Sequence, residues 1–219
     1  MQDADIAPFF ATLRDANPEP ASELDYASVF ELLVAVMLSA QTTDKRVNQV
    51  TRALFASAPT PAKMLALGSA AIETAIKPVG FFRAKTKNLL ATCRILVEQH
   101  GAQVPKTREA LEALPGVGRK TANVVLNNAF GDPTLAVDTH VFRVANRTGL
   151  ALGQTPLEVE FGLLERVPAE FLPNAHHWLI LHGRYVCVAR RPLCEVCAVA
   201  RWCDSAPPEF KNRPAPPSA

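Results

Sequence analysis

Apolar residues recur at helical spacing along most of the chain, and prolines separate the segments that show this spacing. Segment 29–38 is apolar on nearly all sides, which predicts a helix buried in the middle of a core. Thr42 or Thr43 can cap the next helix, at about 44–56. Further helices are predicted at 61–67, 70–77, 84–100, 108–113, 119–130, 139–147, 156–166 and 176–187. No hairpin turn joins two alternating runs, so we predict an all-α fold.

The composition is that of an ordinary globular protein. The 219 residues are 48% hydrophobic and 20% charged, enough for one large domain or two small ones. No apolar run approaches the roughly 18 to 20 residues that span a bilayer, and the acidic N-terminus does not resemble a targeting signal. We therefore expect a cytoplasmic protein with no membrane partner. Residues 205–219 contain five prolines and are predicted to form a flexible tail.

The net charge of +2 conceals an uneven distribution. Residues 1–31 hold seven acidic residues and one basic residue, a net of −6, so the other 188 residues carry 22 basic and 14 acidic residues, a net of +8. A basic surplus permits a polyanionic partner such as DNA or RNA. Many proteins that bind no nucleic acid are equally basic, so charge alone decides little.

Four of the five cysteines fall within 17 residues, with spacings x6, x2 and x5: Cys187, Cys194, Cys197 and Cys203. Two disulfides are one interpretation, but no secretory signal accompanies them. Zinc usually takes two short Cys-x2-Cys pairs, whereas the wider arms here favour an iron–sulfur cluster. The isolated Cys93 is expected in the apolar core.

The loop between the first two of these cysteines contains Arg190 and Arg191. A loop fixed by a metal centre can hold two arginines rigidly against a phosphate. A solvated turn with ordinary surface charge is the alternative.

A Pro-Gly-Val-Gly sequence at 115–118 separates two helical segments. Gly116 and Gly118 permit a tight turn and leave the backbone amides, including that of Val117, open to a ligand. Amides beside a helix N-terminus form a site for a phosphate oxygen. The pattern does not fit a dinucleotide site, because no strand precedes it and no third glycine follows. It is typical of a helix-hairpin-helix that binds the DNA backbone.

Two residues near this hairpin each have two interpretations. Lys120 lies in the first turn of a helix, where a cation is unfavourable; it serves either as a phosphate contact or as an amine with a lowered pKa for Schiff-base chemistry. Asp138 precedes an apolar-periodic helix, so an N-cap is favoured, and a carboxylate partner for the amine is the alternative. His140, His176, His177 and His182 lack the spacing of a zinc site and are expected in packing or hydrogen bonding.

Several motifs in this order resemble one known family, the endonuclease III family of helix-hairpin-helix DNA glycosylases. The matching segments are 38–41, 114–120, 137–140, 176–184 and the four cysteines, so the resemblance covers nearly the whole chain except the tail. It implies a six-helix barrel domain with the hairpin at 22–132. It also implies a second domain, at 1–21 and 133–204, that binds a [4Fe-4S] cluster. Double-stranded DNA is then expected in a cleft between two helical domains of a monomeric enzyme.

The resemblance also assigns roles to individual residues. Lys120 matches the catalytic lysine and Asp138 the catalytic aspartate, which favours the chemical interpretation of Lys120 and reverses the preference stated above for Asp138. The implied reaction removes a damaged pyrimidine and cuts the strand at the resulting abasic site by β-elimination. Gln41 matches a residue that fills the gap left in the duplex. Phe81 stands where the best-known members have leucine, and a larger aromatic side chain can stack on the unpaired base.

Three alternatives remain open. A monofunctional adenine glycosylase of the same superfamily shares the hairpin and the cluster, but it lacks a lysine at the position of Lys120 and usually carries a further C-terminal domain. A non-catalytic iron–sulfur DNA-binding module would not need both Lys120 and Asp138. A zinc-stapled scaffold protein would contain zinc and be colourless in solution.

Overall fold

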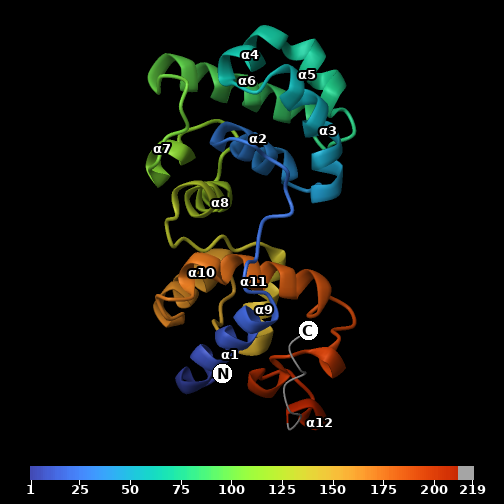
Figure 1. Ribbon diagram of the computed structural model, residues 1–219, viewed down its shortest axis with the longest axis vertical. Helices are drawn as coiled ribbons and strands as arrows, with labels where there is room; N and C mark the ends of the chain where they lie inside the picture. Colours follow the sequence, from blue (N-terminus) through green and yellow to red (C-terminus); the bar gives the residue numbers. More distant parts are fainter. Residues whose placement is uncertain (212–219) are drawn as a thin grey trace. The chain divides into compact units, whose positions relative to one another are not determined.

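The computed structural model describes residues 1–211, and these are helical without a strand (Figure 1). No helix among them is long and apolar enough to cross a membrane. The all-α prediction is therefore confirmed. The elements are α1 (Asp3–Ala16), α2 (Val29–Ser39), α3 (Asp44–Ser57), α4 (Pro61–Leu67), α5 (Ser69–Ile76), α6 (Phe82–Gln99), α7 (Arg108–Glu112), α8 (Arg119–Phe130), α9 (Thr139–Thr148), α10 (Pro156–Arg166), α11 (Leu172–Tyr185), η1 (Cys194–Val196), η2 (Ala200–Trp202) and α12 (Pro208–Lys211).

The chain divides into two compact units. Unit 2 is the continuous segment Ser22–Asp132, and unit 1 combines Met1–Ala21 with the described residues from Pro133 onwards. Each unit has its own apolar core, built from its own residues. The assignment of these units as a barrel domain and a cluster domain stays a prediction.

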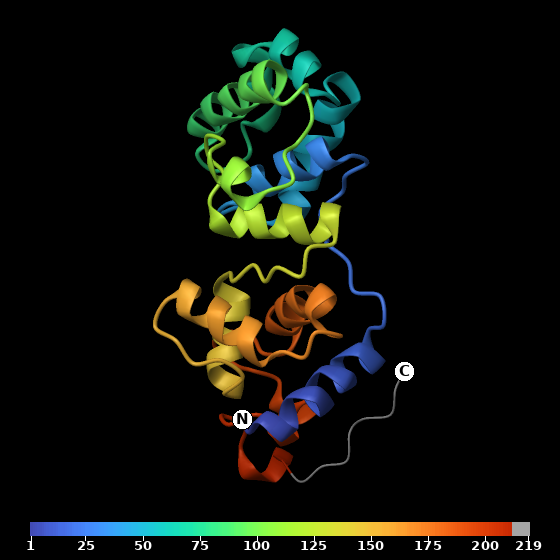
Figure 2. The same ribbon diagram turned by 90° about the vertical axis from the view of Figure 1, so that its left-hand side faces the viewer.

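Helix α2 is the centre of unit 2. It packs against α3, α6 and α8, and its residues from Phe30 to Leu38 are all buried. Burying each large aliphatic side chain stabilises the fold by about 1.5–3 kcal/mol. Ser28 caps the helix by accepting a hydrogen bond from the Glu31 amide at 3.2 Å. The buried helix predicted at 29–38 is thus confirmed. Helices α4 and α5 lie against α6 (Figures 1 and 2).

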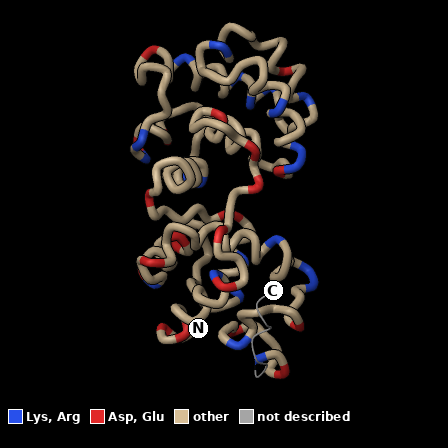
Figure 3. The backbone as a smooth tube through the Cα atoms, viewed as in Figure 1, with Lys and Arg blue, Asp and Glu red and all other residues tan. Residues whose placement is uncertain are grey.

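Helix α1 closes unit 1 from the other end of the sequence. It places Phe9 and Phe10 in the core, and the Phe10 ring stacks on Phe171 with 5.6 Å between centroids. The indole of Trp178 in α11 donates to the Asn17 carbonyl at 2.8 Å. Asp3 and Asp5 stand in the first turn of α1 and Arg14 in the last, the arrangement that complements the helix dipole. Figure 3 marks the acidic and basic positions along the whole described backbone.

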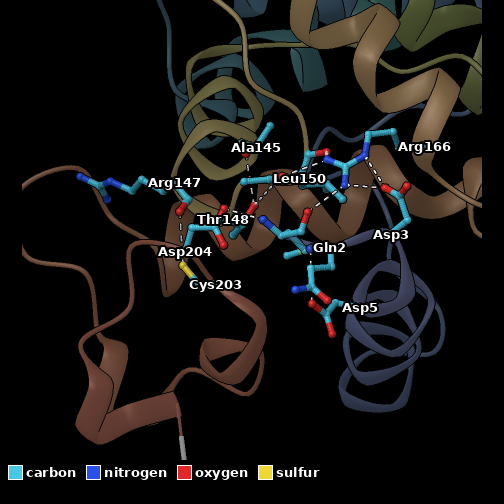
Figure 4. A network of polar contacts seen from close by, with 12 residues as sticks. Gln2, Asp3, Asp5, Ala145, Arg147, Thr148, Leu150, Arg166, Cys203 and Asp204 are labelled. Atoms are coloured by element: carbon cyan, nitrogen blue, oxygen red, sulfur yellow. Dashed lines mark hydrogen bonds and ion pairs between the residues drawn. The ribbon is translucent and has the colours of Figure 1, made fainter.

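Polar contacts fasten this helix to the rest of unit 1 (Figure 4). The Arg166 guanidinium donates to the Asp3 carboxylate at 2.8 Å and to the Gly149 carbonyl at 3.0 Å. The Asp204 amide donates to the Thr148 carbonyl at 3.2 Å. The start of the chain and the segment after the last cysteine are therefore both held at the C-terminal end of α9.

The structure differs from the sequence prediction at several helix ends. Helix α1 was not predicted; its buried residues keep helical spacing, but it contains an internal proline, Pro8. Helix α11 starts at Leu172, four residues early, because Pro173 is tolerated in the first turn. In the predicted tail, Pro208–Lys211 forms α12 against η2, and Ala206 is buried. The other part of that prediction, 212–219, lies outside the described residues.

Candidate functional site

The predicted hairpin joins α7 to α8 within unit 2. Its side chains Leu114 and Val117 are buried in the core. The Val117 amide donates to the Leu114 carbonyl at 3.0 Å, so the expectation that this amide is open to a ligand is wrong. Gly116 has φ +79°, and a Cβ built there would lie 2.7 Å from Asn88 Nδ2 on α6. The turn therefore requires glycine at Gly116, both for its backbone conformation and for its contact with α6.

The positive end of α8 follows this turn. The helix begins at Arg119, and its N-cap Gly118 provides no side-chain hydrogen bond to the first turn. A Cβ built on Gly118 would meet nothing within 4 Å, so the approach to these amides is open. Arg119 and Lys120 are both half-buried, and no acidic residue stands in this turn. This is an arrangement suited to an anion such as a phosphate.

Asp138 caps α9 in unit 1. Its Oδ1 accepts hydrogen bonds from the amides of His140 at 2.8 Å and Val141 at 2.9 Å. The N-cap interpretation is therefore confirmed. Both bonds use the same oxygen, and the residue is only partly buried.

Gln41 and Phe81 share an unusual backbone conformation in unit 2. Their φ angles are +56° and +58°, in the left-handed region that residues with a side chain seldom occupy. Phe81 is 69% exposed, although it is a large aromatic residue. A Cβ built on Gly80 would lie 3.7 Å from the Gln41 carbonyl oxygen, so the two turns are neighbours.

These two turns border one cavity of about 240 Å³ in unit 2. Apolar side chains of α2 and α6 form much of its wall, and polar groups come from Lys85 and Asn88 on α6. Gly116 of the hairpin also lines it. The structure thus brings together three positions predicted to contact DNA: Gln41, Phe81 and Gly116.

Four cysteines line a single apolar cavity in unit 1: Cys187, Cys194, Cys197 and Cys203. All five cysteines of the chain lie in the described part and are free, so the disulfide interpretation is wrong. Cys93 is fully buried in the core of unit 2, as predicted.

Burial governs the chemistry of these thiols. It raises the pKa of Cys197 to about 12, and that of Cys203 is also raised. The buried His182 places Nε2 3.7 Å from Cys197 Sγ. The packing and hydrogen-bonding role predicted for His182 fits this position. Within residues 1–211, no three His, Cys, Asp or Glu side chains are placed to hold a single metal ion.

The loop between the first two of these cysteines is fastened by Arg147 of α9. Its guanidinium donates to the carbonyls of Val188 at 2.8 Å and Ala189 at 2.6 Å, and it lies 3.6 Å from Cys187 Sγ. Arg190 and Arg191 follow directly and are exposed. The loop therefore has an anchored base and two cations facing solvent.

Sequence reasoning missed three residues that support these features: Lys85, Asn88 and Arg147. Lys85 lies in the first turn of α6, where a cation opposes the helix dipole, and this is the signal that could have singled it out. Arg147 gives no comparable signal, because a basic residue in the last turn of a helix is ordinary.

Comparison with known proteins places these features in a family. Residues 34–169 match the family model described as HhH-GPD superfamily base excision DNA repair protein. The chain is 58% identical over 192 residues to Endonuclease III of Escherichia coli (strain K12), covering 88% of this chain and 91% of that protein. It is 53% identical to Endonuclease III of Rickettsia conorii, covering 93% and 97%.

Solved structures give the same result. A trapped endonuclease III–DNA covalent intermediate, in an estranged-adenine complex, is similar with a TM-score of 0.89 at 40% identity, covering 94% of this chain and 97% of that one. A thermostable thymine-DNA glycosylase shares the fold alone, with a TM-score of 0.80 at 22% identity. The chain therefore belongs to the HhH-GPD superfamily of base excision DNA repair proteins and, within it, to the endonuclease III family.

Proposed function

We propose that this protein removes oxidised or otherwise damaged pyrimidines from duplex DNA and cuts the strand through a Schiff base on Lys120. Membership of the endonuclease III family supports DNA glycosylase and AP lyase chemistry. The observation that carries the proposal is the position of Lys120, in the first turn of the helix that follows the glycine hairpin. An adenine glycosylase would lack a lysine there.

The reaction begins when the damaged nucleotide leaves the stack, which costs least where damage has weakened its pairing. The Lys120 amine then attacks C1′ of the deoxyribose, and the bond from C1′ to the base breaks. The base leaves with the bonding electrons and takes up a proton. The sugar ring opens to give an iminium ion between C1′ and Nζ of Lys120.

Strand cleavage follows from the same intermediate. The iminium ion acidifies the C2′ proton, and loss of that proton expels the 3′ phosphate by β-elimination. Asp138 is the carboxylate of the reaction: it stabilises positive charge on the sugar and assists proton transfer. Oδ1 of Asp138 is fixed by two backbone amides, which orients the group for this role. Lys120 belongs to unit 2 and Asp138 to unit 1.

Backbone contacts hold the duplex without reading its sequence. Amides of the turn formed by Gly116, Val117 and Gly118 and of the first turn of α8 donate to a phosphate, the Val117 amide excepted because it bonds Leu114, and Arg190 and Arg191 contact another phosphate. Gln41 fills the space that the flipped nucleotide leaves, while Phe81 stacks on a neighbouring base. The exposure of Phe81 suits such a contact better than a role in the core. The protein acts as a monomer.

The four cysteines are the proposed ligands of a [4Fe-4S] cluster. All four line one apolar cavity. A cubane cluster gives each thiolate its own iron, so its ligands need not converge on one point. When bound, the cluster cross-links residues 187–203 and so holds the loop of Arg190 and Arg191 in place.

Borohydride trapping tests the proposal most directly. The protein is incubated with a duplex containing one abasic site, and borohydride reduces the iminium ion to a stable amine. We expect a covalent protein–DNA adduct attached at Lys120. The variant Lys120→Gln should form no adduct and cleave nothing, while its affinity for the same duplex falls less than about tenfold, because other groups hold the phosphates.

The matched control is Lys87→Gln, which removes the same charge from an exposed position on α6. It should trap and cleave like the unaltered protein. An adduct in Lys120→Gln at the normal rate would overturn the assignment of the nucleophile. Tight binding by the unaltered protein without any adduct would identify a monofunctional glycosylase or a binding module instead.

A further inference from the structure

We propose that Lys85 is a positioning residue that fixes the backbone of Gln41, and so holds the Gln41 side chain ready to enter damaged DNA. The inference rests on the proposed function, because it takes Gln41 as the residue that fills the gap in the duplex. Nothing in the sequence motifs assigns a role to Lys85. Its contacts with the Gln41 turn carry the argument.

The turn at Ser39–Thr42 has the geometry of a type II turn. The Thr42 amide donates to the Ser39 carbonyl at 2.9 Å, Ala40 has φ −55° and ψ 115°, and Gln41 has φ +56°. This turn type favours glycine at the position of Gln41. A residue with a side chain there costs about 1–3 kcal/mol and persists only where the surroundings enforce it.

The alternative for this segment is a type I turn, in which Gln41 would take a negative φ of about −90°. The two turn types differ mainly in the peptide between Ala40 and Gln41, which is rotated by about half a turn. The Ala40 carbonyl then points in the opposite direction, and the side chain of Gln41 leaves the backbone along another line. A group that holds the Ala40 carbonyl therefore selects the conformation of Gln41.

Lys85 is that group. Its ammonium donates to the Ala40 carbonyl at 2.6 Å, and it also donates to the Leu38 carbonyl at 2.7 Å and to the Thr42 hydroxyl at 3.4 Å. These acceptors stand on both sides of Gln41. The cation also complements the negative C-terminal end of α2. Lys85 thus braces the turn from a separate helix, α6.

The same contacts argue against Lys85 as a direct phosphate contact. An ammonium group has three donors, and the protein supplies three acceptors for them. The side chain is also only partly exposed. Lys87, two residues later, lies about 200° further round the helix and is exposed, so it retains its charge for solvent.

A double-mutant cycle tests the coupling between Lys85 and Gln41. We would measure binding to a duplex with a stable tetrahydrofuran abasic site and to the same duplex undamaged, using Lys85→Met, Gln41→Ala and the double variant. Lys85→Met should weaken binding to the abasic duplex about tenfold and leave binding to undamaged DNA within about twofold. In the Gln41→Ala background, Lys85→Met should cause no further loss.

Additive losses in the two single variants would overturn the proposal, because Lys85 would then act independently of Gln41. If Lys85→Met weakened binding to both duplexes equally, and the salt dependence of binding fell by about one ion, Lys85 would be a phosphate contact. That result would also overturn the proposal. Lys85→Arg keeps the charge and the donors, and it should retain most of the preference for the abasic duplex. If Lys85→Met proves unstable, Lys85→Arg provides the test on its own. If it loses as much preference for the abasic duplex as Gln41→Ala does, the hydrogen-bond donors of Lys85 do not have the proposed role.

The control Lys87→Met removes an exposed charge from the same helix and should change neither affinity by more than about twofold. Borohydride trapping of the unaltered protein separates the two proposals. If the unaltered protein forms no adduct, the proposed function fails. If it forms the adduct and Lys85→Met retains full preference for the abasic duplex, only the inference about Lys85 fails.

Discussion

At the scale of single residues, the two glycines of the hairpin, Gly116 and Gly118, have different roles. Gly116 has φ +79° and lies against Asn88, whereas Gly118 has φ −100° and open space where a Cβ would be. Glycine is required at Gly116 because of the backbone conformation. At Gly118 it is required because a side chain would obstruct the approach of a ligand to the amides. The motif makes them look equivalent, and only their conformations distinguish them.

We therefore predict that alanine at Gly116 affects stability and alanine at Gly118 affects DNA binding. Gly116→Ala should lower the free energy of unfolding by about 1–3 kcal/mol, because it adds backbone strain and a contact with Asn88 that is too short. Gly118→Ala should leave thermal stability nearly unchanged and weaken binding to undamaged duplex, because the methyl group obstructs a phosphate. Thermal unfolding and duplex titration on both variants check the pair. Equal stability losses would contradict this division of roles.

At the scale of elements, α9 links two parts of unit 1. Asp138 caps its N-terminus, and Arg147 in its last turn holds the loop that follows Cys187. A rigid helix of this kind fixes the distance between a carboxylate and a basic loop. The position of the loop thus depends on Arg147, which holds the backbone just before Arg190 and Arg191.

Removing this anchor should loosen the loop without melting the helix. Arg147→Met keeps the length of the side chain but cannot donate to Val188 or Ala189, so we expect faster amide hydrogen exchange in 188–192 and weaker DNA binding. Lysine cannot form both hydrogen bonds with one planar group. The exchange rate and the DNA affinity of Arg147→Lys should therefore lie between those of the unaltered protein and those of Arg147→Met. Unchanged exchange in Arg147→Met would show that the loop is held by other contacts.

The elements predictable from sequence were those with strong periodicity or a cap. Segment 29–38 is apolar on nearly all sides, so its burial was predictable. Helix α1 was not predicted, although its buried residues Ile6, Phe9, Phe10 and Leu13 keep helical spacing, and the proline inside it, Pro8, is a signal against a helix. The motifs supplied the candidate site residues, and the structure supplies their local geometry. The bracing of Gln41 by Lys85 could not be predicted, because it joins residues 45 and 47 positions apart.

At the scale of the whole molecule, each unit has an independent core. The four proposed cluster ligands all belong to unit 1. Loss of the cluster should therefore disturb unit 1 and leave unit 2 intact. A single experiment that follows both units can therefore show whether they lose stability independently.

Cys197→Ser provides the test. We expect loss of the visible absorbance of the cluster and faster hydrogen exchange in 187–206, with exchange in 22–132 unchanged. Cys93→Ser is the control, because Cys93 is buried in unit 2 and should not affect the absorbance. Normal iron content in Cys197→Ser would remove Cys197 from the ligand set.

The two-part construction of unit 1 has a consequence for synthesis on the ribosome. Asn17 at the end of α1 finds its partner Trp178 161 positions later, so the aromatic face of α1 emerges long before the side chains that cover it. At roughly 5–20 residues per second, this interval lasts about 10–30 s. Unit 2 is a continuous segment, so all of its residues are synthesised within that time. During this interval the aromatic side chains of α1 are therefore exposed at the start of the nascent chain, and by the end of the interval every residue of unit 2 has already been made. An exposed apolar helix of this kind is a binding site for a chaperone.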